Sequence, residues 1–137
     1  MAKMILGGTL AVLLALLAGF LWGASGKTTI ARALERSELR NELLDARGSA
    51  LAARADIYNT NFGDANRHLE EARASVARAV QRLEQLGDDA GVQRLQAALG
   101  PIEEAQRLAS TLDLGANARA AAAVDTLESV LETTARP

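Results

Sequence analysis

The sequence contains no cysteine, two prolines, and very few aromatic residues: one tryptophan, one tyrosine and two phenylalanines. The lack of cysteine excludes disulfides, thiolate metal sites and cysteine catalysis. Because aromatic residues are scarce, any core must consist of Leu, Val, Ile and Ala. These side chains let helices approach closely but bury little area each, so a stable domain needs long helices.

A basic surface is also missing. The 15 basic residues are nearly balanced by 17 acidic ones, and Lys3 is the sole charged residue before Lys27. A protein that binds nucleic acid usually carries a strong basic excess on one face. We therefore expect no nucleic-acid partner.

Catalytic and metal-binding groups are sparse as well. The single histidine, His68, follows Asp64 by four residues and precedes Glu71 by three, a spacing that is common on exposed helix surfaces. Residues 23–29 end like a phosphate-binding loop, but Leu21 occupies the position of its first glycine and no strand precedes it. We expect no catalytic residue, no metal and no cofactor.

The longest feature that is present is the uncharged run from Met4 to Gly26. An apolar helix of about 20 residues crosses a bilayer core of about 30 Å. The run therefore predicts a transmembrane anchor over residues 1–26 and a helical domain outside the bilayer over residues 27–137. A cleaved signal peptide is the alternative, since Lys3 precedes the run, but the run exceeds the usual length of such a segment.

Small residues recur at every fourth position of this run, and Trp22 and Lys27 stand at its end. Small side chains let two helices pack closely in lipid, and Trp and Lys are typical of the membrane interface. We therefore expect the small residues to pack against another helix and the last two to anchor the segment. The small residues are Gly7, Ala11, Ala15, Gly19 and Gly23.

The location follows from composition and charge. Abundant arginine and alanine are typical of a GC-rich bacterial genome, which places the anchor in a bacterial inner membrane. A short basic tail before an apolar run is typical of a signal anchor and favours a periplasmic domain. The basic residues just after the run, Lys27, Arg32, Arg36 and Arg40, favour the cytoplasmic side instead. Of the two, we expect the periplasmic side.

Residues 30–137 have helical periodicity throughout. We expect a first helix from Ile30 to Tyr58, preceded by a looser helix at Gly26 and capped by Thr28 or Thr29. Further helices are expected over about 65–86, over 92–112 with a break at Gly100-Pro101, and over 118–133. The predicted fold is all-α: the anchor followed by about four antiparallel helices. The face expected to be buried in the first helix contains Ile30, Leu34, Leu44, Leu51, Ala55 and Tyr58, with Leu39 and Leu43 beside it.

The turn at residues 59–64 joins two segments with a recognisable pattern. Ala65, Leu69 and Ala72 follow it as small, large and small residues, and Tyr58 precedes it. This stretch resembles one tetratricopeptide-type hairpin, which implies two closely packed antiparallel helices. We expect Tyr58 and Phe62 to pack this hairpin, with contact to a partner protein as the alternative.

Together these features predict a non-enzymatic single-pass membrane protein. Its partners would be the lipid bilayer and other membrane protein subunits, or further copies of itself. The first hypothesis is an accessory or structural subunit that docks onto a larger membrane complex, for example an energy-transducing one. The alternatives are a homo-oligomeric tether or envelope scaffold, and a membrane-anchored adaptor that binds peptides or proteins.

Overall fold

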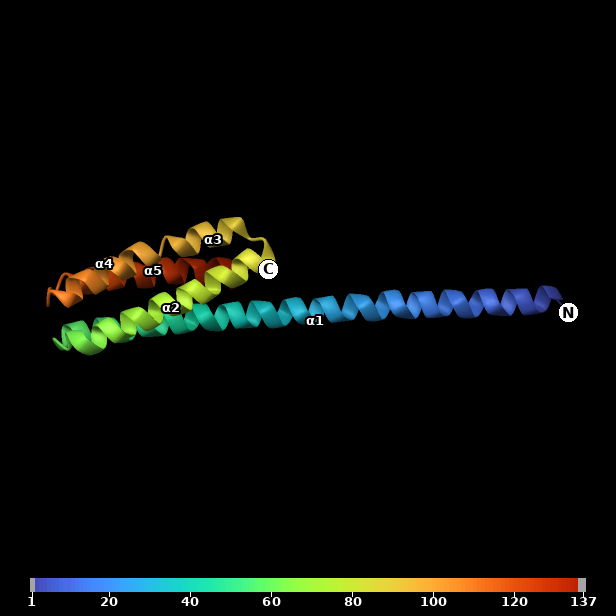
Figure 1. Ribbon diagram of the computed structural model, residues 1–137, viewed down its shortest axis with the longest axis horizontal. Helices are drawn as coiled ribbons and strands as arrows, with labels where there is room; N and C mark the ends of the chain where they lie inside the picture. The colour runs from blue at the N-terminus through green and yellow to red at the C-terminus, as the bar shows by residue number, and fades with distance from the viewer. Residues whose placement is uncertain (1, 136–137) are drawn as a thin grey trace. The chain divides into compact units, whose positions relative to one another are not determined.

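The computed structural model describes the backbone of residues 2–135 and the side chains of residues 30–134. Within this range every regular element is a helix, which confirms the all-α prediction (Figure 1). The chain divides into two compact units, Met1–Arg36 and Ser37–Pro137. The helices are α1 (Ala2–Tyr58), α2 (Phe62–Leu86), α3 (Asp89–Gln96), α4 (Leu99–Ser110) and α5 (Ala116–Ala135).

The course of α1 corrects one prediction. The helix runs from Ala2 to Tyr58 without a break, so Gly26 does not loosen it and neither Thr28 nor Thr29 caps a new helix. A glycine inside a helix costs about 1 kcal/mol relative to alanine. That penalty is too small to end a helix whose neighbouring residues favour helix.

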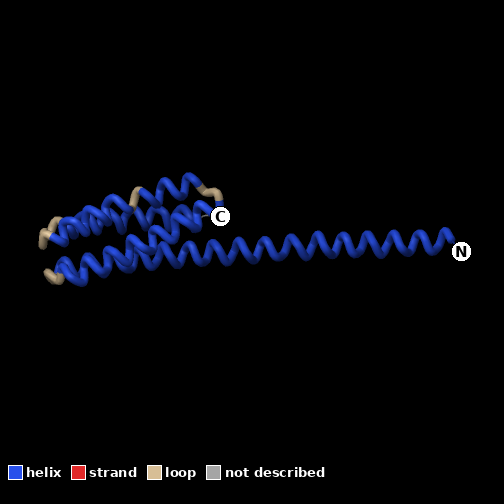
Figure 2. The backbone as a smooth tube through the Cα atoms, in the orientation of Figure 1, coloured by secondary structure: helices blue, strands red, loops and turns tan. Residues whose placement is uncertain are grey.

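The second unit is an antiparallel bundle of four helical segments, of which α3 and α4 together form one. Both α2 and α5 pack against α3 and α4. Ion pairs place α1 beside its two neighbours: Glu38 pairs with Arg82 of α2, and Arg47 pairs with Glu128 of α5. The turns that join these four segments lie at the two ends of the bundle, and the short connection between α3 and α4 lies part-way along it (Figure 2).

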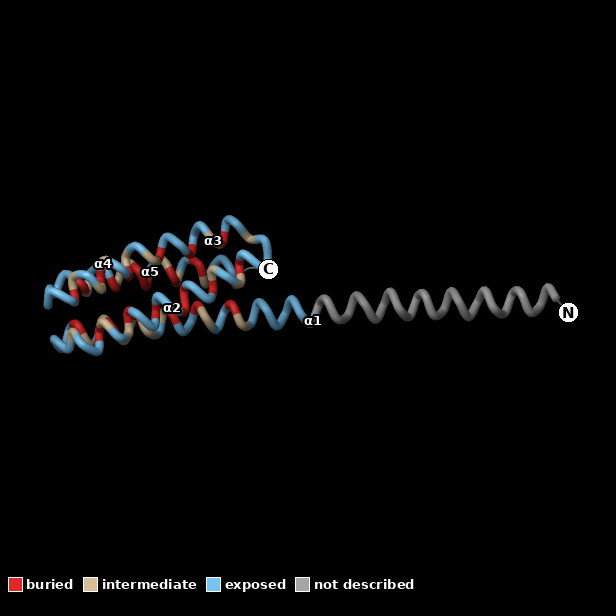
Figure 3. The backbone as a smooth tube through the Cα atoms, in the orientation of Figure 1, coloured by how far each residue is buried: buried red, intermediate tan, exposed pale blue. Residues whose placement is uncertain are grey.

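The core consists of side chains spaced alternately three and four residues apart on every helix. This is the spacing of helices that pack at about 20° in bundles. About half of the core residues are alanines, and their small side chains let the helices lie close together. Buried positions follow one side of each helix (Figure 3). On α1 they form the inner stripe, which consists of Leu39, Leu43, Ala46, Ala50, Ala53 and Ile57.

The inner stripe corrects the face predicted for the first helix. Of the residues expected to be buried, Leu44 is 43% exposed and Tyr58 is 81% exposed, while Leu39 and Leu43 are buried. Both faces of α1 carry the same alternating spacing, so spacing alone does not distinguish them. The buried face is the one on which every position is apolar.

The layer formed by α3 and α4 is interrupted at Ala97 and Ala98, a few residues before the predicted break at Gly100-Pro101. Pro101 lies in the first turn of α4. Because proline has no N–H, it cannot donate to the carbonyl of Ala97, four residues earlier. The effect of the proline therefore appears one turn upstream of it.

Three helix ends in the bundle use the same backbone motif. In each, a residue one or two positions after the helix end has positive φ, and the next N–H donates to a carbonyl five residues earlier, as in a Schellman motif. The positive-φ residues are Thr60, Gly87 and Leu112. Gly87 was expected to end the second helix, and it does; the other two positions hold residues that rarely adopt this conformation.

Candidate interaction surfaces

The predicted anchor lies outside the described side chains. Gly7, Ala11, Ala15, Gly19 and Gly23 are among the residues whose side chains the structure leaves undescribed, as are Trp22 and Lys27. Among the residues that are described, none of the helices has an apolar stretch long enough to span a bilayer. The anchor and its packing residues therefore stay predictions.

Large apolar residues occupy both turns at one end of the bundle, where α1 meets α2 and α4 meets α5. We call these residues the apolar tip: Tyr58, Phe62, Leu112 and Leu114. Tyr58, Leu112 and Leu114 are 81%, 69% and 60% exposed. A hydrogen bond of 3.1 Å from Arg54 Nε to Asn117 Oδ1 joins the end of α1 to the start of α5, so both turns lie at this end.

The turns of the apolar tip are well ordered by hydrogen bonds. Asn61 N donates to Asp56 O at 2.8 Å, and Asp113 N donates to Leu108 O at 2.9 Å. Asp113 Oδ1 also accepts from Gly115 N at 2.7 Å. Leu112 is held at φ 59°, a conformation that costs a non-glycine residue about 1 kcal/mol. This geometry holds the Leu112 side chain in solvent.

The two aromatic residues expected to pack the first hairpin differ. Phe62 is half-buried and packs against the core, as expected, but Tyr58 projects into solvent. Ala65, Leu69 and Ala72 are buried in the antiparallel hairpin, in agreement with the packing that the tetratricopeptide resemblance implies.

Leu112 and Leu114 were missed by sequence reasoning, which assigned Leu112 to the preceding helix. The signal that could have revealed them is their position directly before Gly115, because two leucines in a turn have no helix face to join.

His68 lies in a polar cluster between α1 and α2. Its Nδ1 is 3.0 Å from Glu71 Oε2, and its Nε2 is 3.5 Å from Asp56 Oδ2. The Asp56 oxygen is buried and accepts no hydrogen bond from the described residues. The described residues contain no group of three or more ligands that could hold a metal ion. The cluster joins the two helices near the turn.

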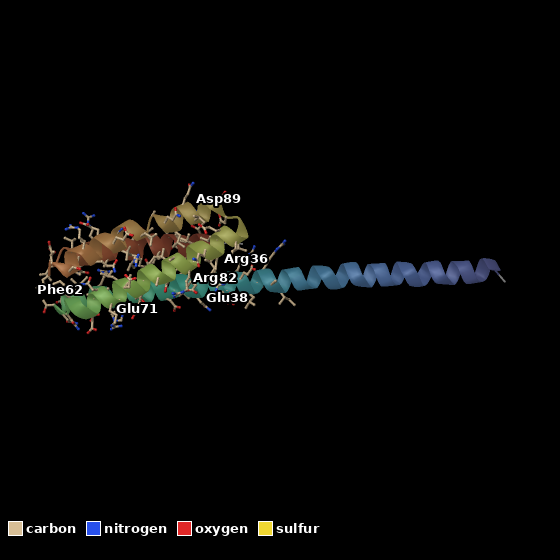
Figure 4. The ribbon with its side chains drawn as sticks, viewed as in Figure 1. Arg36, Glu38, Phe62, Glu71, Arg82 and Asp89 are labelled. Carbon is tan, nitrogen blue, oxygen red and sulfur yellow. The ribbon has the colours of Figure 1, made fainter. Side chains whose placement is uncertain are left out.

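Local ion pairs on α2 and α4 lower the pKa of several carboxylates. The amide of Asn61 and then Arg67 hold the pKa of Asp64 below its ordinary value. The hydrogen bond from Arg73 similarly lowers the pKa of Glu70. All of these carboxylates are exposed, so each pair contributes little to stability. Figure 4 shows such side chains along the outside of the bundle.

Comparisons with protein-family models, with curated proteins and with solved structures find no match for this chain.

Proposed function

We propose that the protein is a non-enzymatic, single-pass membrane protein whose helical bundle docks by its apolar tip onto another membrane protein, as an accessory subunit. The observation that carries this proposal is the apolar tip itself. Large apolar side chains that are exposed at one end of a domain, especially aromatic ones, are typical of protein contacts.

The conformation of Leu112 supports the proposal further. A glycine at this position would end α4 with less strain, as Gly87 ends α2. Strained conformations at exposed positions often coincide with functional surfaces. Here the strain holds a large apolar side chain outside the core, where it is available to a partner.

The membrane anchor is the part of the proposal that rests on sequence. The uncharged run from Met4 to Gly26 is long enough to span a bilayer, and the basic tail at Lys3 favours export of the bundle to the periplasm. In sealed, inverted inner-membrane vesicles, whose interior is the periplasmic side, protease should then cleave the bundle only after the vesicles are opened. Cleavage in sealed vesicles would show that the bundle lies on the cytoplasmic side. Release of the chain from the membrane by alkaline carbonate would exclude the anchor.

The docking proposal is tested with Leu112→Gly in the full chain. Removing the strain should raise the free energy of unfolding by about 1 kcal/mol, while removing the apolar side chain should weaken docking. A variant that is more stable but docks less well cannot be explained by unfolding.

Docking is measured with a photo-reactive benzophenone amino acid placed at Leu114, an exposed residue of the apolar tip, in native membranes. A control probe at Gln93, an exposed residue of α3 near the other end of the bundle, should give little product. We expect the Leu114 probe to link to a different membrane protein, and Leu112→Gly to reduce that product. No product at Leu114, or a product of two copies of this chain, would overturn the proposal.

A further inference from the structure

The outward face of α1 carries a second stripe with the same alternating spacing as the inner stripe. We call it the outer stripe: Ser37, Asn41, Leu44, Gly48, Leu51, Ala55 and Tyr58. Leu51 is half-buried and the others are exposed. In the sequence the same spacing continues upstream to Leu34 and Ile30, which are 59% and 72% exposed.

A spacing that alternates between three and four residues defines a heptad, whose positions a and d meet a partner helix. Asn41, Gly48 and Ala55 are at position a. Position d holds Leu44 and Leu51, the residue type preferred there in parallel dimers, and also Ser37 and Tyr58. The inner stripe then occupies positions c and f, on the opposite side of the helix. α1 can therefore contact the bundle and a second helix at once.

The residues that flank the outer stripe have opposite charges on its two sides. Arg40, Arg47 and Arg54 occupy position g, while Glu38 and Asp45 occupy position e. In a parallel coiled coil, position g of one helix faces position e of the next heptad on the other helix. Arg40 would then face Asp45 of a second copy. An antiparallel arrangement would bring arginines against arginines and acids against acids.

Most of these flanking charges already have partners in the bundle. Glu38 pairs with Arg82, as labelled in Figure 4, and Arg47 pairs with Glu128. Arg54 donates to Asn117. Arg40 and Asp45, by contrast, are exposed and make no ion pair with any residue in the described range 30–134. Arg40 and Asp45, the two residues that a parallel dimer would bring together, are thus the two flanking charges that form no ion pair within the bundle.

From this match we infer that two copies of the chain pair in parallel along their outer stripes, with Arg40 of each facing Asp45 of the other. Asn41 lies opposite Asn41, an arrangement that fixes register and favours two strands at some expense in stability. The occupant is a second copy because the stripe and its flanking charges are complementary to themselves. Except for Tyr58, this surface is separate from the apolar tip, so either proposal can fail without the other.

Because the chain has no cysteine, single cysteines report directly on this pairing. Disulfides form only when the two Cα atoms come within about 7 Å. In a parallel, in-register pair every position d faces itself, so Ser37→Cys and Leu51→Cys should both give disulfide-linked dimers of the full chain in native membranes. The matched control is Ser110→Cys on α4, an exposed serine on a helix away from α1, which should remain monomeric.

Other occupants give other results. An antiparallel pair would link at no more than one of the two positions. If a different protein covered the stripe, neither cysteine would give a homodimer. Either result would overturn the inference.

The second test exchanges the charges at positions 40 and 45. Sedimentation equilibrium in mild detergent measures how strongly the chains pair. Arg40→Asp places like charges opposite each other twice per dimer, and should weaken pairing about tenfold. Adding Asp45→Arg to the same chain should restore it. Positions 40 and 45 face different directions on one helix, so rescue requires contact between copies. Pairing unaffected by Arg40→Asp, or a double variant as weak as the single one, would overturn the Arg40–Asp45 contact.

Discussion

The inner and outer stripes of α1 lie on the same helix, have the same spacing and extend over nearly the same residues, but their surroundings differ. The inner stripe has apolar side chains at all of its positions and is buried. The outer stripe includes Ser37, Asn41 and Gly48 and is largely exposed. A periodic pattern thus shows that a helix has a contact face. Which face enters the core depends on whether any position on it would bury a polar group at a cost.

The largest expected difference is between two adjacent leucines. Leu43 is fully buried and Leu44 is 43% exposed. Leu43→Ala should lower the free energy of unfolding of a single chain by about 2–5 kcal/mol, because it leaves a cavity, and Leu44→Ala by less than about 1 kcal/mol. Urea unfolding of the full chain in mild detergent, diluted until the chains no longer pair and followed by circular dichroism, measures both. Equal losses would mean that the two stripes are not distinguished as described.

A smaller effect is expected when alanines are enlarged. Ala53 of the inner stripe is fully buried, whereas Ala55 of the outer stripe is exposed. Ala53→Leu should cost about 1–3 kcal/mol through overpacking, and Ala55→Leu should change the stability of a single chain by no more than about 0.5 kcal/mol. The same unfolding measurement applies. If Ala55→Leu instead destabilises the chain as strongly, position 55 packs inward.

Replacing two glycines by alanine should change the free energy of unfolding in opposite directions. Gly48 lies inside α1, where an added Cβ would meet open space, so Gly48→Ala should stabilise the helix by about 0.5–1 kcal/mol. Gly87 has φ 71°, so Gly87→Ala should destabilise the bundle by about 1 kcal/mol. The midpoints of thermal unfolding should move in opposite directions. A loss for Gly48→Ala would indicate a close neighbour at the outer stripe that restricts this position.

The smallest effect concerns acid. The inner stripe has no titratable group, but the exposed surfaces of α2 and α4 carry carboxylates whose pKa lies below the ordinary value, including Glu70 and Glu104. A lowered folded-state pKa stabilises the protein above the unfolded-state pKa, and this contribution is lost as pH falls through the folded-state value. Stability should therefore decline below about pH 4.5. Unfolding midpoints in 1 M NaCl should decline less, because salt screens exposed pairs; an unchanged slope would exclude these pairs as the cause.

Much of the bundle could be predicted from local signals. The turn after Tyr58, the helix end at Gly87 and the helical character of residues 30–133 follow from turn residues and periodicity. The buried face of α1 could not be assigned in the same way, because two stripes with equal spacing compete. The break lies upstream of the predicted Gly100-Pro101 because the N–H that proline lacks would have bonded to a carbonyl in the preceding turn.

The candidate surfaces were accessible to sequence reasoning only in part. Tyr58 and Phe62 could be identified as the two aromatic residues of the bundle, and one of them is exposed. Leu112 could not be placed because its role depends on a positive φ in a position where glycine is the usual residue. The outer stripe was found as a pattern, but interpreted as core.

The break between α3 and α4 has a consequence for how the bundle moves. α3 has eight residues, of which only Gly91 and Leu95 are buried, and Leu95 alone of these two has a side chain, so α3 is held by far fewer apolar contacts than its neighbours. Segments of this kind open locally at a free energy below that of global unfolding. Amide hydrogens of α3 should therefore exchange ahead of those of α2. Local opening should therefore begin at α3, while the six buried side chains of the inner stripe keep α1 packed against its neighbours.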